Sequence, residues 1–142
     1  MGSGRFREID HAADLGLDLE GPDPGAVLEA AQRGLVQVLF GDIPSIPATE
    51  EREISLVEAG YAELLKAWCE RLYRLIEEER FVPLESRVDD SGPARFRAKV
   101  RGARLTPQAL AEASELKAVT WHQLALETSP AGGWRGRVIF DV

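Results

Sequence analysis

The sequence has few of the residues on which nucleophilic and zinc chemistry depend. Its 142 residues include one cysteine, Cys69, and two histidines, His11 and His122. A single cysteine excludes an intramolecular disulfide framework, and this set is too small for most zinc sites and most catalytic triads. The sequence also contains no glycine motif of the kind that cradles phosphates. A pair of carboxylates acting as acid and base remains open, although no spacing singles one out.

Long apolar runs and an excess of positive charge are absent as well. No run is long enough to span a bilayer and no signal peptide is recognisable, so we expect a cytoplasmic protein with no membrane partner. The net charge of −7 argues against a generic binder of nucleic acid or of membrane surfaces. The length predicts one domain over residues 1–142, and residues 1–5 are expected to be disordered.

Hydrophobic periodicity predicts an α+β fold, in which two main helices pack on a largely antiparallel sheet. The pair Asp23-Pro24 is typical of a helix start, and apolar residues then recur at helical spacing to about residue 40. A second apolar stripe over residues 61–76 predicts the other helix, with Cys69 buried as a structural thiol. A short helix is expected at 106–113, and strands at 14–20, 52–57, 94–102, 115–128 and 136–142.

The stretch 11–21 has a regular strand pattern, but an aspartate stands at the start of the predicted strand. Leucines at positions 15, 17 and 19 point to one face of the predicted strand, and Asp14 points to the other face with the remaining even-numbered residues. Aspartate is depleted in strands because its short carboxylate competes for backbone donors. Asp14 is therefore either a turn former or a ligand.

The last residues of the sequence carry the other candidate ligands. The apolar run Val138 to Phe140 is typical of a core strand, and Asp141 and Val142 follow it directly. The side chain of Asp141 and the terminal carboxylate of Val142 are therefore close together. If this strand lies beside the opening one, Asp14 joins them, and three negative groups repel one another unless a cation binds or one group is protonated. Hard oxygen donors without histidine or cysteine suit Ca²⁺ or Mg²⁺.

A basic stripe, formed by Arg95, Arg97, Lys99 and Arg101, alternates with apolar residues in the strand expected at 94–102. These cations are suited to phosphates or to an acidic partner surface. The interpretation that we favour is the solvated face of an antiparallel strand, where basic side chains also discourage association between sheet edges.

Two further polar residues fall in the strand expected at 115–128. Its two-residue period places Lys117 and His122 on opposite faces, so they can share one site only if a bulge intervenes. His122 shares its expected face with Leu124 and Leu126, which favours a histidine buried in the core.

Four stretches of the sequence resemble the archease family. They are His11-Ala12-Ala13-Asp14-Leu15-Gly16, Leu64-Leu65-Lys66-Ala67-Trp68, Leu116-Lys117-Ala118-Val119-Thr120-Trp121-His122 and Val138-Ile139-Phe140-Asp141-Val142. Each is weak alone, but they occur in the family's order and together span residues 9–142. Two positions depart from the family pattern: Ala12 replaces a usual threonine, and Ala103 stands where the family often has glutamate.

The resemblance implies a metal-binding protein cofactor and not an enzyme. Archeases activate RtcB-type, GTP-dependent RNA ligases of tRNA splicing and RNA repair, by promoting guanylylation of the ligase and permitting multiple turnover. The metal ligands implied by matching position are Asp14, Asp141 and the terminal Val142. The expected cofactor is a divalent cation, Ca²⁺ first, with Mg²⁺ or Mn²⁺ as alternatives. The implied fold is two strand-helix-strand-strand modules, one inserted in the other.

The expected partner is thus an RtcB-type RNA ligase, and RNA is met only through that ligase. His11, Lys117 and His122 are candidate contacts with the partner. Two alternatives remain open. One is a metal-dependent hydrolase that uses the same carboxylates with a metal-bound water, and the other is a chaperone of RNA or of tRNA modification.

Overall fold

The structure is a computed structural model that describes residues 3–11, 14–41 and 46–142, and for residues 10, 11 and 14 it describes the backbone alone. In chain order the elements are β1 (Arg5–His11), β2 (Asp14–Gly21), α1 (Pro24–Phe40), β3 (Glu50–Leu56), α2 (Tyr61–Glu79), β4 (Phe81–Gly92), β5 (Arg95–Arg104), α3 (Pro107–Ala111), β6 (Ala118–Val119), β7 (Ala125–Thr128) and β8 (Trp134–Asp141). None of the helices in this described part is long and apolar enough to cross a membrane.

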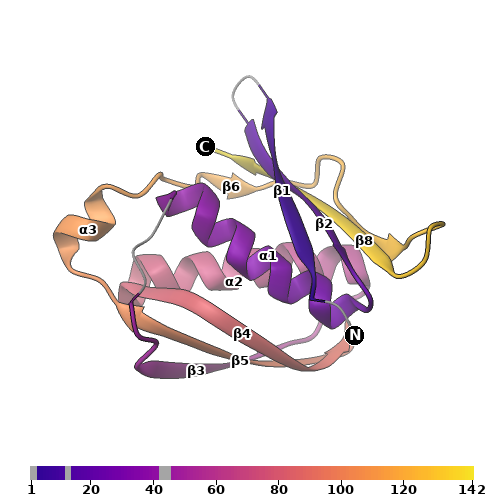
Figure 1. Cartoon of the computed structure of the whole chain (residues 1–142), viewed down its shortest axis with the longest axis horizontal. Helices are drawn as coiled ribbons and strands as arrows, with labels where there is room; N and C mark the ends of the chain where they lie inside the picture. The colour runs from indigo at the N-terminus through magenta and orange to yellow at the C-terminus, as the bar shows by residue number, and fades with distance from the viewer. Residues whose placement is uncertain (1–2, 12–13, 42–45) are drawn as a thin grey trace.

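The strands form two antiparallel sheets, and helices α1 and α2 lie between them (Figure 1). The first sheet has the order β1-β2-β8-β6, with β7 also paired to β8, and the second has the order β3-β5-β4. The predicted α+β class with antiparallel pairing is confirmed, but the strands divide into two sheets where we expected one. The unit β3-α2-β4-β5 is inserted between α1 and β6, so one strand-helix-strand-strand module lies inside the other.

Helix α1 occupies the middle layer, and its sequence suits that position. The Asp23 carboxylate accepts a hydrogen bond from the Ala26 amide (2.8 Å), and Gly41 ends the helix with a φ of 68°, so the predicted helix is confirmed. Buried residues occur around most of its circumference because it contacts both sheets. At Gly34 a Cβ atom would lie 2.7 Å from the Leu17 side chain of β2, so glycine permits the close packing.

Side chains of α1 also satisfy backbone groups of β4, an edge strand whose register with β5 shifts twice. The buried Gln32 donates to the Pro83 carbonyl (2.7 Å) and accepts from the Ser86 hydroxyl (3.0 Å). The Glu29 carboxylate accepts from the Val88 amide (2.8 Å). The Pro83 carbonyl and the Val88 amide, which lie at the two register shifts, are therefore bonded to side chains of the helix.

Helix α2 buries a single apolar stripe, as its sequence predicts. Trp68 is fully buried, donates from its indole N–H to the Leu28 carbonyl (2.7 Å) and meets the Phe96 ring edge-on at 5.1 Å. Cys69 is fully buried too, and burial raises the pKa of its thiol to about 12. The prediction of a structural thiol is therefore confirmed.

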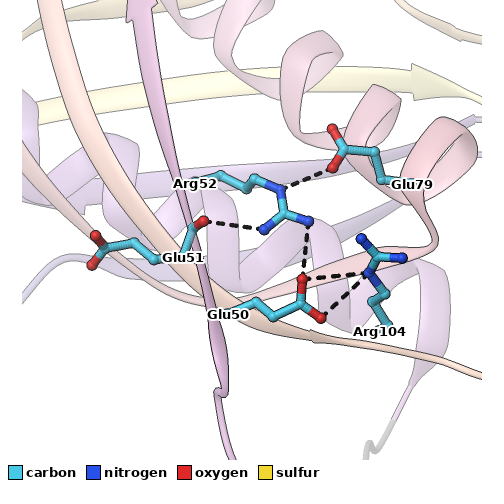
Figure 2. A network of polar contacts seen from close by, with 5 residues as sticks. All are labelled: Glu50, Glu51, Arg52, Glu79 and Arg104. Carbon is cyan, nitrogen blue, oxygen red and sulfur yellow. Dashed lines mark hydrogen bonds and ion pairs between the residues drawn. The ribbon is translucent and has the colours of Figure 1, made fainter.

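A network of ion pairs holds the C-terminal end of α2 against the second sheet (Figure 2). Arg52 of β3 donates to Glu79 of α2 (2.8 Å) and to Glu50 (3.1 Å), and Glu50 also pairs with Arg104 (3.3 Å). The Arg52 guanidinium lies 4.6 Å from the centre of the Phe81 ring. Hydrogen bonds with Glu79 and Glu50 raise the pKa of Arg52, so the network keeps its charge.

The prediction of one continuous strand over 115–128 is wrong, because the chain makes a turn between residues 119 and 125. Only β6 and β7, at its two ends, pair with β8, and a turn separates them. Gln123 has a positive φ of 53°, and the Leu124 amide donates to the Trp121 carbonyl (3.2 Å). The two-residue alternation therefore breaks, and His122 is exposed instead of buried in the core.

The N-terminal segment 1–5 differs from the expected disorder where it is described. Residues 1 and 2 lie outside the described residues, but Gly4 is buried and Arg5 begins β1. The Gly4 carbonyl accepts a hydrogen bond from Arg33 of α1 (2.7 Å). A Cβ atom at Gly4 would collide with the Ala26 carbonyl, so the lack of a side chain lets this segment pack on the helix.

Candidate functional site

Strands β2 and β8 lie side by side, and the candidate ligands are at one end of this pair. Asp14 is the register partner of Asp141, and His11 of β1 is the register partner of Asp14. Figure 1 shows the C-terminus close to β6 and to the ends of β1 and β2. The backbone therefore meets the condition under which Asp14 joins the last two residues of the sequence.

A second set of residues aligned across β1, β2 and β8 shows how this sheet neutralises an acidic residue. Asp18 is aligned with Arg7 and Arg137, and it accepts hydrogen bonds from Arg7 (2.9 Å) and from Arg137 (2.7 and 3.0 Å). Burial alone would raise the pKa of Asp18, but the hydrogen bonds and charges of the two arginines outweigh it and hold the pKa below its usual value. The residues aligned with Asp14 across these strands are His11, Asp141 and Ala118, and none of them is an arginine or a lysine.

Asp18 and Arg137 were not singled out from the sequence, although a signal was present. Asp18 follows Asp14 at an even spacing, so both fall on one face of the strand, and Arg137 precedes Asp141 in the same way. Only the pairing of β2 with β8 shows that the two residues meet, because 119 positions separate them in the chain.

We expect Asp18→Asn to lower stability most at neutral pH. Because the folded pKa of Asp18 is lowered, its stabilising contribution is present above the unfolded value of 3.8 and is lost as the pH falls through the lower folded value. Denaturant unfolding should show the variant to be about 1–2 kcal/mol less stable at pH 7, with a difference that shrinks below about pH 4.

The control for this measurement is Asp89→Asn, which removes an exposed ion pair with Arg87 on the second sheet. It should cost less than about 0.5 kcal/mol throughout, because exposed pairs contribute little. A difference between wild type and Asp18→Asn that stays constant from neutral to acidic pH would contradict the ion-pair account.

The end of β8 is held on both sides. Asp141 is aligned with Asp14 on one side and with Ala118 of β6 on the other, and its carbonyl accepts a hydrogen bond from the Lys117 amide (2.8 Å). Val142 is partly buried and packs against the hydrophobic core. The backbone that carries the Asp141 side chain and Val142 is therefore positioned by pairing and by packing.

The donor chemistry of this end fits a hard divalent cation. The Asp141 side chain carries carboxylate oxygens, and the sequence supplies Asp14 at the aligned position of the neighbouring strand. Among the side chains that the structure describes, no group of three His, Cys, Asp or Glu residues is arranged to hold a metal ion. The side chain of Asp14 lies outside that set, so the ligands Asp14, Asp141 and Val142 remain a prediction.

The three predicted partner contacts, His11, Lys117 and His122, do not all lie at this end of the sheet. Lys117 is exposed and directly precedes β6, where its amide bonds to Asp141. His122 is also exposed but lies in the turn after β6, where its amide donates to the Thr120 hydroxyl (3.3 Å). His11 is described by its backbone alone, in register with Asp14. The structure therefore brings Lys117 and the backbone of His11 to the candidate metal end.

The basic stripe runs along β5, the central strand of the second sheet. Acidic residues of β4 face it, because Arg101 pairs with Glu85 (3.5 Å) and Arg95 lies 3.8 Å from Asp90. The stripe is thus a solvated face with cross-strand partners, as we favoured, but it does not protect an edge, because β5 is not an edge strand. Partial neutralisation of this kind argues against an RNA chaperone that binds phosphates through the stripe.

Comparison with known proteins identifies the family. The sequence profile of the archease protein family matches residues 6–142, which include all four of the stretches that carried the resemblance. The chain belongs to the archease family. It is 30% identical to the archease of Methanosarcina barkeri, over 97% of this chain and 96% of that protein. It is 28% identical to the archease of Thermococcus gammatolerans, over 97% and 99%.

Solved structures agree with this assignment. The solution structure of protein 1598 of Methanobacterium thermoautotrophicum is similar over the whole of both chains, with a TM-score of 0.76 and 25% identity. The crystal structure of an archease from Thermotoga maritima, described as a possible chaperone, covers 96% of each chain with a TM-score of 0.65 and 22% identity. The α+β architecture of this archease-family chain is therefore confirmed.

Proposed function

We propose that this archease-family chain is a metal-binding protein cofactor that activates an RtcB-type, GTP-dependent RNA ligase of tRNA splicing and RNA repair. It promotes guanylylation of the ligase and permits multiple turnover. The observation that carries the proposal is the alignment of Asp14 with Asp141 at the end of β8, in a chain that matches the family over residues 6–142. The description of the T. maritima relative as a possible chaperone is compatible with a protein that assists another.

The metal part of the proposal follows from charge. The two-residue period of a strand puts positions 14 and 18 of β2 on one face, and positions 137 and 141 of β8 on one face. Two aspartates and a terminal carboxylate repel one another unless a positive charge lies between them. Asp18 receives that charge from arginines in register, whereas Asp14 has none in register. Ca²⁺ is the proposed ligand, with Mg²⁺ or Mn²⁺ as alternatives, because these cations prefer oxygen donors.

The proposed division of work leaves the chemistry to the ligase. Cys69 is buried with a raised thiol pKa, so the chain's one cysteine is not a nucleophile. An activator without chemistry acts by binding one conformation of the ligase more tightly than another, and it shifts their populations only by that difference in affinity. The cation orders the contact surface, to which His11, Lys117 and His122 contribute. RNA is reached only through the ligase.

The first test is Ca²⁺ binding by calorimetry. Because both aspartates are proposed ligands, the double variant Asp14→Ala, Asp141→Ala should bind Ca²⁺ at least about tenfold more weakly than wild type. Asp89→Ala removes an exposed carboxylate of the second sheet and should bind as wild type does. Equal affinities for wild type and the double variant would show that the site is assigned to the wrong residues.

The role of the terminal carboxylate has its own test. A short C-terminal extension beyond Val142 converts that carboxylate to an amide, so it should weaken Ca²⁺ binding by removing a ligand charge. An extension of the same sequence before Met1 leaves the proposed ligands unchanged and should have no effect. If both extended proteins bind Ca²⁺ equally well, Val142 is not a ligand.

Function is tested by single-turnover formation of the ligase–guanylate adduct from labelled GTP with the cognate ligase. The Ca²⁺-loaded wild type should accelerate adduct formation, and Asp14→Ala or Asp141→Ala should abolish the acceleration with an unchanged circular dichroism spectrum. Asp89→Ala is the matched control and should accelerate as wild type does. An adduct rate that does not respond to folded, Ca²⁺-loaded wild type would overturn the proposal in favour of the metal-dependent hydrolase.

A further inference from the structure

Trp121 is the large aromatic side chain that this structure leaves in solvent. Within the described part of the chain, the exposed large hydrophobic residues are Trp121, at 65% of its surface, and Val57, at 76%. Val57 follows β3 in the inserted module, whereas Trp121 lies in the turn between β6 and β7. Exposed tryptophan is uncommon on protein surfaces and is enriched where partners bind.

The turn that carries Trp121 is attached to β8 on both sides of this residue. The Thr120 amide and hydroxyl both donate to the Ile139 carbonyl (2.9 and 3.0 Å). On the other side, Arg137 donates to the Gln123 side chain (2.8 Å). Trp121 is therefore exposed because the backbone holds it there, and not because it lies at the end of a loose loop.

A neighbouring helix also orders the ring itself. The Lys66 ammonium of α2 lies 4.7 Å from the centre of the Trp121 ring and 2.8 Å from the Glu70 carboxylate one helical turn away. The Lys66 side chain is only 14% exposed, so its stem is packed. An aromatic ring that is ordered before binding loses little conformational freedom when a partner covers it.

The segment that carries the Trp121 ring is bonded to β8 next to the proposed metal end. Its anchor residue Ile139 lies two positions before Asp141 on β8, and the Lys117 amide bonds to the Asp141 carbonyl on the same edge. Lys117 and His122 are exposed on the segment that carries the ring. The Trp121 surface, defined as Trp121 with Lys66, Lys117 and His122, thus presents an apolar centre with Lys66 at the ring and with Lys117 and His122 exposed on the same segment.

We infer that Trp121 is the anchor through which this chain docks on its protein partner, which rests on the proposed function and identifies that partner as the ligase. The complementary surface on the ligase is an apolar pocket bordered by carboxylates, which accept Lys117. A protein is favoured over RNA because the net charge is −7 and the adjacent end of β8 carries Asp141 and Val142. Docking at Trp121 brings the metal end against the ligase.

The test compares the affinity of the cognate ligase for wild type and for Trp121→Ala, in Ca²⁺, by calorimetry. Loss of a central aromatic anchor should weaken the complex about 10- to 100-fold. Trp121→Phe should recover part of that loss, and Lys66→Met, which frees the ring, should weaken binding only a few-fold. Val57→Ala is the control for loss of an exposed apolar side chain and should bind as wild type does.

Ca²⁺ affinity, measured in the same variants, separates docking from the metal site. Trp121→Ala should bind Ca²⁺ as wild type does, because it removes none of the proposed ligands. A wild type that does not bind the ligase would overturn both this inference and the proposed function. Folded Trp121→Ala that binds the ligase as tightly as wild type would overturn the inference alone. The inference would also be overturned if Trp121→Ala bound a single-stranded RNA oligonucleotide more weakly than wild type does but bound the ligase equally well. That result would assign the Trp121 surface to RNA.

Discussion

The pairing of β2 with β8 is the interaction on which the candidate site depends. Leu17 and Val138 are aligned in this pair and are fully buried on one face, while Asp18 and Arg137 pair on the other. A register shift by one residue would turn β2 over, burying its acids and exposing its leucines. The register that buries the core is therefore the register that aligns Asp14 with Asp141, so core packing and the proposed site are selected together.

The rest of the molecule supports this pair of strands. Helix α1 packs on β2 at Gly34 and bonds to β4 through Gln32, so it joins the first sheet to the second. The inserted module is attached to α1 by the hydrogen bond from the indole N–H of Trp68 to the Leu28 carbonyl. Within the module, the Arg52 network joins β3 to the C-terminal end of α2. Because β5 has cross-strand acidic partners, the charged face of this module is a poor candidate for binding RNA. The proposed metal end and the Trp121 surface both belong to the first sheet and its connections.

Local signals in the sequence predicted the elements, whereas the arrangement of the strands needed the structure. Asp23 and Gly41 mark the ends of α1 through their own capping interactions, so the helix is predictable from nearby residues alone. The turn at Gln123 was missed because no glycine, asparagine or proline marks its positive φ. The division into two sheets and the Asp18–Arg137 pair depend on contacts between distant residues, which periodicity does not encode. Asp14 and Asp141 were predicted as neighbours because both lie at strand ends and both fall in stretches that resemble archease.

The central claim is that Asp14, Asp141 and Val142 share a cation. The most direct test is whether removing the Asp14 charge raises or lowers the melting temperature. Thermal unfolding of wild type and Asp14→Asn is compared in a chelator and in saturating Ca²⁺. Without metal, removing one of three mutually repelling carboxylates should raise the melting temperature above that of wild type. With Ca²⁺, wild type should gain more stability than the variant, because it binds the cation more tightly, and the order should reverse. A variant that is less stable than wild type by the same amount in both conditions would contradict the claim.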